Sequence, residues 1–262
     1  MTKIIAVTNQ KGGVGKTTTS VNLAASLAAC KKKTLLIDMD PQGNATMGCG
    51  IEKNEQENTI YDVLVGDTPI ESVITPSQYD KHLQVVASND DLTAAEIELV
   101  SLPHREYRLK QQIATIADAY DYIILDCPPA LSMLTVNALT AADSVLIPVQ
   151  CEYYALEGLS SLVQTIRKVK HAVNPHLEIE GLLRTMYDPR NSLTQDVTKQ
   201  LIEHFGDRVY QTTIPRNVRL AEAPSYGVPV LHYDKKSKGA TAYLALAGEL
   251  MRLEKKIKLA KA

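Results

Sequence analysis

The sequence lacks several features that would mark other classes of protein. It has only four cysteines (Cys30, Cys49, Cys127 and Cys151) and no C-x-x-C pair. This argues against a disulfide framework or a zinc site, favours a reducing compartment and predicts small buried thiols. No apolar run approaches the roughly 20 residues that span a bilayer, and no basic leader precedes the first strand-like run. We therefore expect a soluble cytoplasmic protein.

An excess of charge of one sign is also missing. The chain carries 28 Lys and Arg against 30 Asp and Glu, for a net charge of −2. A globally basic nucleic-acid-binding protein is thereby excluded, whereas a local basic patch is not. No long Pro-, Gly- or Ser-rich linker, repeat or low-complexity tract divides the chain. We therefore predict a single domain over residues 1–262.

Short β-branched runs alternate with longer helical patterns. The strand-like runs occupy residues 4–8, 34–38, 83–88, 122–126, 144–149, 179–183 and 209–214, and the helical patterns occupy 17–30, 105–119, 154–173, 193–204 and 239–257. Near-continuous apolar strands between amphipathic helices predict a doubly wound α/β domain with a mostly parallel sheet flanked by helices. The less regular stretch 50–70 is expected to be an excursion that moves when a ligand binds.

The first strand-like run leads into a phosphate-binding loop, "TNQKGGVGKTTTSVNL". The P-loop pattern G-x-x-x-x-G-K-[ST] fits, except that Gln10 stands where the first glycine belongs and a second lysine, Lys11, lies inside the loop. The backbone N–H groups that converge on phosphate oxygens belong to Gly12, Gly13, Val14 and Gly15. A glycine-rich turn alone would not explain a lysine and a threonine at this spacing.

Three further loop residues supply side-chain chemistry for a nucleotide. Lys16 is expected to reach the β- and γ-phosphates, and Thr17 to offer its hydroxyl to Mg²⁺. Thr18 adds a donor at the positive end of the helix that follows. The chain is therefore predicted to be a P-loop NTPase.

Carboxylates follow two other strand-like runs. "LLIDMDPQGNAT" places Asp38 and Asp40 at the end of the second run, and "YDYIILDCPPALS" ends an apolar run at Asp126, where a Walker-B carboxylate holds the Mg²⁺ shell. Since the carboxyl ends of parallel strands share one edge of a sheet, all three should lie near the phosphate loop. Taken alone, Asp38 or Asp40 would as readily be a turn residue or a helix cap.

Five motifs together resemble the ParA/Soj chromosome-partitioning ATPases. They are "KGGVGKTT", "DMDPQGNAT", "LDCPPALS", "PVQCEYYALEGL" and "IPRNVRLAEAPSYGVPV". This family belongs to the deviant Walker A class, together with MinD and the nitrogenase iron protein. The resemblance runs from about residue 3 to residue 250, and the last two motifs point to the Soj-like branch.

The resemblance gives the extra lysine a role. In the family, the residue matching Lys11 reaches the partner's ATP phosphates across a nucleotide-sandwich homodimer, so that positive charge arrives where the phosphoryl group develops negative charge. Asp40 then orients the attacking water, and Asp38 lies beside it near the Mg²⁺ shell. Their motif contains no histidine, and we expect intrinsic hydrolysis to be slow. Lys11, Lys16 and Asp40 are thus the expected catalytic residues.

The family also indicates where the base and DNA bind. Positions matching the adenine site are Met186 and the segment from Pro215 to Asn217, and the sequence has no N-K-x-D element that would read guanine, so ATP is the expected nucleotide. The positions that match non-specific double-stranded DNA contacts are Arg190 and Arg219. The basic residues that could widen this patch are Arg216, Lys235, Lys236 and Lys238.

The resemblance further implies a ParB-like centromere-binding partner that stimulates hydrolysis, and a nucleoid-associated location. Two alternatives from the same class are weaker. An iron–sulfur electron donor needs cysteines at the dimer axis, but Cys127 has no second cysteine at a plausible spacing. A MinD-like membrane protein needs a basic amphipathic C-terminal helix.

The C-terminal "ELMRLEKKIKLAKA" only partly fits such a membrane helix. Leu250, Leu253, Ile257 and Leu259 supply apolar side chains, but the segment has no Trp or Phe to anchor in a lipid interface. We expect it to pack on the domain with a solvated end and predict no membrane contact.

Overall fold

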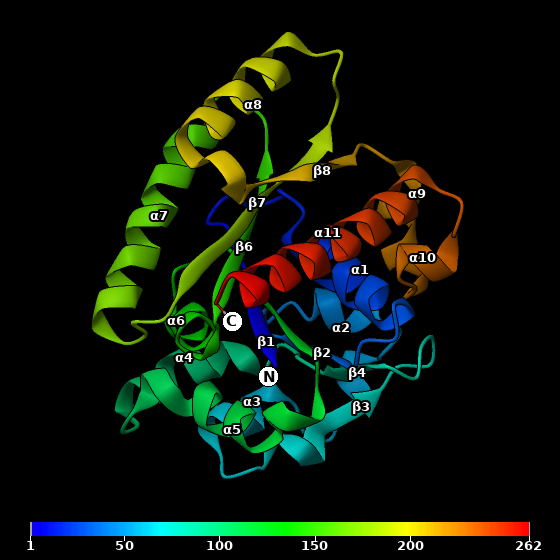
Figure 1. Ribbon diagram of the computed structural model, residues 1–262. Coiled ribbons are helices and arrows are strands. Elements are labelled where there is room, and N and C mark those ends of the chain that lie inside the picture. Colours follow the sequence, from blue (N-terminus) through cyan, green and yellow to red (C-terminus); the bar gives the residue numbers. More distant parts are fainter. Residues whose placement is uncertain (1, 262) are drawn as a thin grey trace.

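An eight-stranded sheet forms the centre of the protein (Figure 1). The computed structural model describes residues 2–261, apart from the side chains of residues 257, 258, 260 and 261. The strand order across the sheet is β3-β4-β2-β5-β1-β6-β7-β8. The strands are β1 (Lys3–Val7), β2 (Thr34–Asp38), β3 (Ile74–Pro76), β4 (Leu83–Val86), β5 (Tyr122–Asp126), β6 (Ser144–Gln150), β7 (Glu178–Tyr187) and β8 (Val209–Pro215).

All neighbouring strands run parallel except at one edge, where the short β3 pairs antiparallel with β4. The predicted α/β class with a mostly parallel sheet is therefore confirmed. Parallel pairing brings the carboxyl ends of β1, β2 and β5 to the same edge, and in this register Asp38 lies opposite Asp126. The two predicted carboxylates thus meet at the end of β1, where the phosphate loop begins.

The continuous apolar strands are explained by burial on both faces. Successive side chains of a strand point to opposite faces, and in β1 Ile5 and Val7 join one hydrophobic cluster while Ala6 joins the other. The same alternation in β5 sends Ile124 to the first cluster and Leu125 to the second. Since neither face meets water, the strands need no polar alternation.

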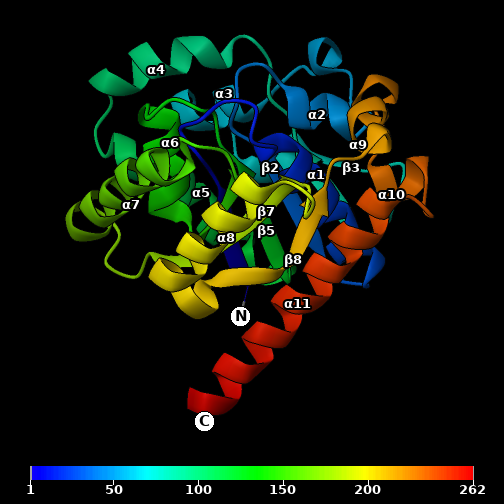
Figure 2. The ribbon, with the colours of Figure 1, turned by 90° about the horizontal axis from the view of Figure 1, so that it is seen from above.

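Helices cover each face of the sheet (Figure 2). The core cluster on one face includes residues of α1 (Lys16–Ala29), α2 (Asn44–Gly48), α9 (Val218–Glu222), α10 (Val230–Tyr233) and α11 (Lys238–Lys261). The cluster on the other face includes residues of α3 (Ile60–Val65), α4 (Leu92–Ser101), α5 (Arg108–Ile116), α6 (Met133–Ala141), α7 (Ala155–Ala172) and α8 (Ser192–Phe205). None of the described helices is long and apolar enough to cross a membrane.

Several predicted details need correction. The stretch 50–70 is not simply an irregular excursion, because it contains α3, whose Ile60, Val63 and Leu64 are fully buried. The thiols of Cys49, Cys127 and Cys151 are buried as predicted, but Cys30 is exposed because it caps the end of α1 at the surface.

The C-terminal helix packs as predicted. Leu250 is fully buried and Leu253 packs against the same cluster, whereas Leu259 is 79% exposed. The Ile257 side chain lies outside the described residues.

Candidate functional site

The loop from residue 8 to 15 joins β1 to α1 at the carboxyl edge of the sheet. Gly13 has φ 73° and Gly15 has φ 86°, conformations in which a Cβ would be strained. Gly15 precedes α1, and no side chain caps the helix. The first N–H groups of α1 therefore remain available to an anion, which the helix dipole also favours.

The strands beside the loop hold it in place. Asn9 donates from Nδ2 to the Pro148 carbonyl at 2.8 Å, and its Oδ1 accepts from the Lys11 N–H at 3.0 Å. Further along the loop, the Thr185 hydroxyl donates to the Val14 carbonyl at 2.8 Å. The loop is thus tied to both β6 and β7. Neither Asn9 nor Thr185 was singled out from the sequence, because both contacts join segments far apart in the chain.

Lys16 lies inside the site rather than on its surface. Only 7% of the residue is exposed, and Nζ donates to the Lys11 carbonyl at 3.3 Å. Burial lowers the pKa of Lys16, while the charges of Asp126 and Asp40 act in the opposite direction. The ammonium group is therefore bonded to a loop carbonyl and stabilised by the charge of nearby carboxylates, where a phosphate can approach it.

Asp126 has one oxygen without a partner. Its Oδ1 accepts from the Ser20 hydroxyl at 2.6 Å, whereas Oδ2 is buried and has no hydrogen bond. Burial, reinforced by the charge of Asp38, raises the pKa of Asp126, and the hydroxyl of Thr17 lies near enough to favour its charged form. An oxygen-binding cation or its water shell would satisfy Oδ2, so Thr17 and Asp126 fit a magnesium site.

Both carboxylate oxygens of Asp38 accept hydrogen bonds from other groups of the protein. Its Oδ2 accepts from both the backbone N–H and the hydroxyl of Thr46 at 2.8 Å each, and its Oδ1 accepts from the Asp40 N–H at 3.1 Å. Burial raises its pKa. Asp38 thus fixes the start of α2 and the position of Asp40. Asp40 is half-buried, and its charge interacts with that of Lys16. A direct contact of Asp38 with the nucleotide stays a prediction.

The extra lysine has a partner in its own chain. Lys11 Nζ lies 2.8 Å from Oε2 of Glu152, and the two side chains are 39% and 47% exposed. Glu152 lies between β6 and α7. Sequence reasoning did not single it out, although it lies inside the motif "PVQCEYYALEGL".

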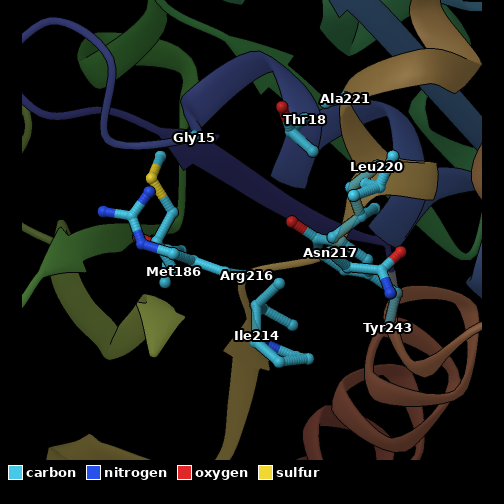
Figure 3. Close-up of a pocket in the computed structure, with 12 residues that line it drawn as sticks. Gly15, Thr18, Met186, Ile214, Arg216, Asn217, Leu220, Ala221 and Tyr243 are labelled. Carbon is cyan, nitrogen blue, oxygen red and sulfur yellow. The ribbon is translucent and has the colours of Figure 1, made fainter. Parts of the chain in front are cut away.

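A cavity of about 440 Å³ adjoins the phosphate loop. Figure 3 shows Met186 and Arg216 on one side of it and Asn217, Leu220 and Tyr243 on the other, with Thr18 at the start of α1. Met186 has φ 48°, which is unusual for a residue with a side chain, and Asn217 Oδ1 is buried without a partner. The structure therefore brings Met186, Pro215 and Asn217 together beside Gly15 and Thr18.

The two arginines predicted to contact DNA do not line this cavity. Arg190 and Arg219 have side chains that are 88% and 50% exposed, and each is paired with carboxylates. Hydrogen bonds from Arg190 lower the pKa of Asp188 to about 2, and the hydrogen bond to Glu222 raises the pKa of Arg219.

Comparisons with known proteins agree with this geometry. A family model described as an AAA domain matches residues 2–179. The chain is 56% identical over 250 residues to the sporulation initiation inhibitor protein Soj of Bacillus subtilis, covering 95% of this chain and 98% of Soj. It is 54% identical over 250 residues to the chromosome partitioning protein ParA of Myxococcus xanthus, covering 95% and 88%. The chain belongs to the ParA/Soj family.

Solved structures of P-loop ATPases share the fold. Cobyrinic acid a,c-diamide synthase from Mycobacterium smegmatis with bound ADP and magnesium has 36% identity and a TM-score of 0.85, covering 97% of this chain and 96% of that chain. The cell division ATPase MinD of Pyrococcus furiosus has 26% identity and a TM-score of 0.80, covering 97% and 100%. The predicted ParA/Soj membership and P-loop type are confirmed.

Proposed function

We propose that this ParA/Soj protein is an ATP-dependent DNA-partitioning ATPase that binds Mg²⁺ and ATP. The observation that carries the proposal is the buried Lys16, stabilised by the charges of Asp126 and Asp40, at the start of a helix that no side chain caps. The bound ADP and magnesium of the Mycobacterium smegmatis structure support the choice of ligands. The higher identity to Soj and ParA favours partitioning over the synthase activity in that protein's name.

Each residue of the site has a physical task. Lys16 and the N–H groups from Gly12 to Thr18 balance phosphate charge, and Thr17 and Asp126 hold the magnesium shell. The metal, when bound, withdraws charge from the β- and γ-phosphate oxygens. Asp40 accepts a hydrogen bond from the attacking water and holds it in line, and Asp38 keeps Asp40 in place.

The cavity beside Gly15 and Thr18 receives the adenine. Its largely apolar walls pack against the ring, and the unpaired Asn217 Oδ1 can accept from the exocyclic amino group. A buried acceptor without a donor carries a penalty that a bound adenine removes.

Homodimer formation follows from Lys11. Two ATP-loaded protomers bring six nucleotide phosphate groups and their negative charge to a shared face, and a lysine crossing from each side offsets that charge. In the free protomer Lys11 rests on Glu152, so the γ-phosphate of the partner competes with a carboxylate for the same ammonium group. Dimerisation therefore depends on ATP rather than ADP.

The dimer binds double-stranded DNA non-specifically through Arg190 and Arg219, because two protomers double the number of phosphate contacts. Slow hydrolysis, stimulated by a ParB-like protein, separates the protomers and releases the DNA. The protein then alternates between nucleoid-bound and free states.

The deciding experiment is co-sedimentation with DNA and with anionic liposomes under ATP, ADP and no nucleotide. We expect DNA binding with ATP only, and none to liposomes. Pelleting with liposomes but not DNA would refute the proposal in favour of a MinD-like membrane protein.

A further inference from the structure

Arg190 is held by Asp188 in a two-point contact. Its Nε donates to Oδ1 at 2.9 Å and its Nη2 to Oδ2 at 2.8 Å, the fork geometry with which arginine binds carboxylates and phosphates. The backbone N–H of Arg190 also donates to Oδ1 at 3.0 Å, so the carboxylate fixes the turn as well as the side chain. The edge of the guanidinium best suited to a phosphate is therefore already occupied.

Arg219 is held by two carboxylates from separate elements. Its Nη1 donates to Oε2 of Glu222, one turn along α9, at 2.8 Å, and its Nε lies 3.3 Å from Oδ2 of Asp234, which follows α10. The Tyr233 hydroxyl donates to the same Glu222 oxygen at 3.3 Å and keeps the acid in position. Two of the nitrogen donors of Arg219, Nη1 and Nε, are therefore already paired with carboxylate oxygens.

The lysines of the same region differ. Lys236 and Lys238 line a neighbouring groove of about 550 Å³, together with Tyr187 and Thr212. Within residues 2–261 the structure gives neither lysine an ion pair, although both arginines have one. Pairing is thus a property of the arginines and not of every cation on this face.

We propose that Asp188, Glu222 and Asp234 act as built-in phosphate mimics that compete with DNA for Arg190 and Arg219 and so set the affinity of the dimer for DNA. This inference rests on the proposed DNA binding. A phosphate can take the occupied edge of each guanidinium only by displacing a carboxylate, which must then be rehydrated and neutralised by a counterion. The gain in counterion entropy that drives binding is correspondingly reduced.

The competition weakens binding without preventing it. The ion pairs of both arginines are exposed to solvent, where ion pairs contribute little, and DNA presents a dense row of phosphates against one or two fixed acids at each arginine. Such a surface binds DNA tightly only when two protomers combine their arginines, and it releases DNA readily when they separate. If the arginines had no carboxylate partners, the free monomer would also bind DNA, and the difference in DNA affinity between dimer and monomer would be smaller.

Asp188→Asn is the most direct test, because the amide oxygen can still accept from the Arg190 N–H and preserve the turn. DNA affinity of the ATP-bound dimer is measured by fluorescence anisotropy on a duplex of random sequence at several salt concentrations. Two copies of the pair per dimer predict binding that is about two- to thirtyfold tighter, with a salt slope steeper by about two. Glu222→Gln combined with Asp234→Asn should act in the same direction.

Two controls separate the competition from a general loss of negative charge. Glu203→Gln changes an exposed acid on α8 for which the described residues show no ion pair, and it should leave affinity unchanged. Asp188→Asn in an Arg190→Ala background should bring no gain, since the arginine it releases is gone.

An equal gain with and without Arg190 would overturn the proposal, as would wild-type affinity in Asp188→Asn when Arg190→Glu weakens binding. If the wild-type dimer binds no DNA at all with ATP, and the Asp188→Asn dimer binds none either, the proposed function itself fails.

Discussion

Lys11 Nζ and Glu152 Oε2 lie 2.8 Å apart within one chain. They are separated by 141 positions in the sequence, and they meet because β1 and β6 are neighbours in the sheet. The lysine expected to serve the partner's nucleotide therefore begins bound to an acid of its own protomer.

Glu152→Gln should make dimerisation with ATP easier. Removing the carboxylate frees Lys11, and an exposed pair of this kind is worth at most about 1 kcal/mol, so two copies predict a dimer dissociation constant lowered by up to about thirtyfold. Analytical ultracentrifugation with a slowly hydrolysed ATP analogue measures it. Glu157→Gln, an exposed acid on the first turn of α7, is the matched control. A dimer weaker than wild type would show that Glu152 supports the sandwich rather than opposing it.

Lys16→Ala should abolish ATP binding, because the phosphates lose the ammonium group held beside them. We expect affinity to fall by at least about a hundredfold, the loss of a buried charge-assisted contact, in a titration with a fluorescent ATP analogue. Lys11→Ala is the control, since its exposed side chain should affect dimerisation and not nucleotide affinity. Affinity within a few-fold of wild type in Lys16→Ala contradicts the loop assignment.

Asp40→Ala should trap the ATP-bound dimer. The carboxylate that positions water is lost, while Lys16, Thr17 and the loop N–H groups remain, so hydrolysis slows by roughly a hundredfold or more without loss of binding. Gel filtration with ATP should show a dimer that persists for hours. Asp67→Ala, an exposed acid elsewhere, should behave like wild type. Wild-type turnover in Asp40→Ala means that another group holds the water.

Gly12→Val separates dimerisation from nucleotide binding. A Cβ at Gly12 meets no atom within 4 Å in the protomer, so the side chain fits the free chain, and in the proposed dimer it would obstruct the facing protomer. The expected product is an ATP-binding monomer, detected by light scattering together with an ATP-affinity measurement. The smaller Gly12→Ala should impair the dimer less. An ATP-dependent dimer of normal affinity argues against the sandwich.

The fold, and the placement of the residues proposed to bind phosphate, were largely predictable because they depend on local pattern. The runs at 34–38 and 122–126 match β2 and β5 residue for residue, and strand ends in a parallel sheet bring Asp38 and Asp126 together. Short or uniformly apolar helices were missed. In α6, most residues from Leu134 to Ala141 are buried, so no polar face marks a helical period.

Contacts between distant segments were not predictable from pattern alone. Glu152 on Lys11 and Asp234 on Arg219 each depend on how separate elements approach one another. The sequence contains these residues, but nothing in their spacing indicates which acid meets which base.

The walls of the 440 Å³ cavity continue directly into the arginine segments. Met186 is followed two positions later by Asp188, and Asn217 is followed two positions later by Arg219. A purine ring bound against these walls would contact the same two stretches of backbone that carry the ion pairs. One of these stretches includes Met186, whose backbone is left-handed. Under the proposed function, the adenine site and the arginines that contact DNA therefore share two stretches of chain, and coupling between them needs no long relay across the sheet.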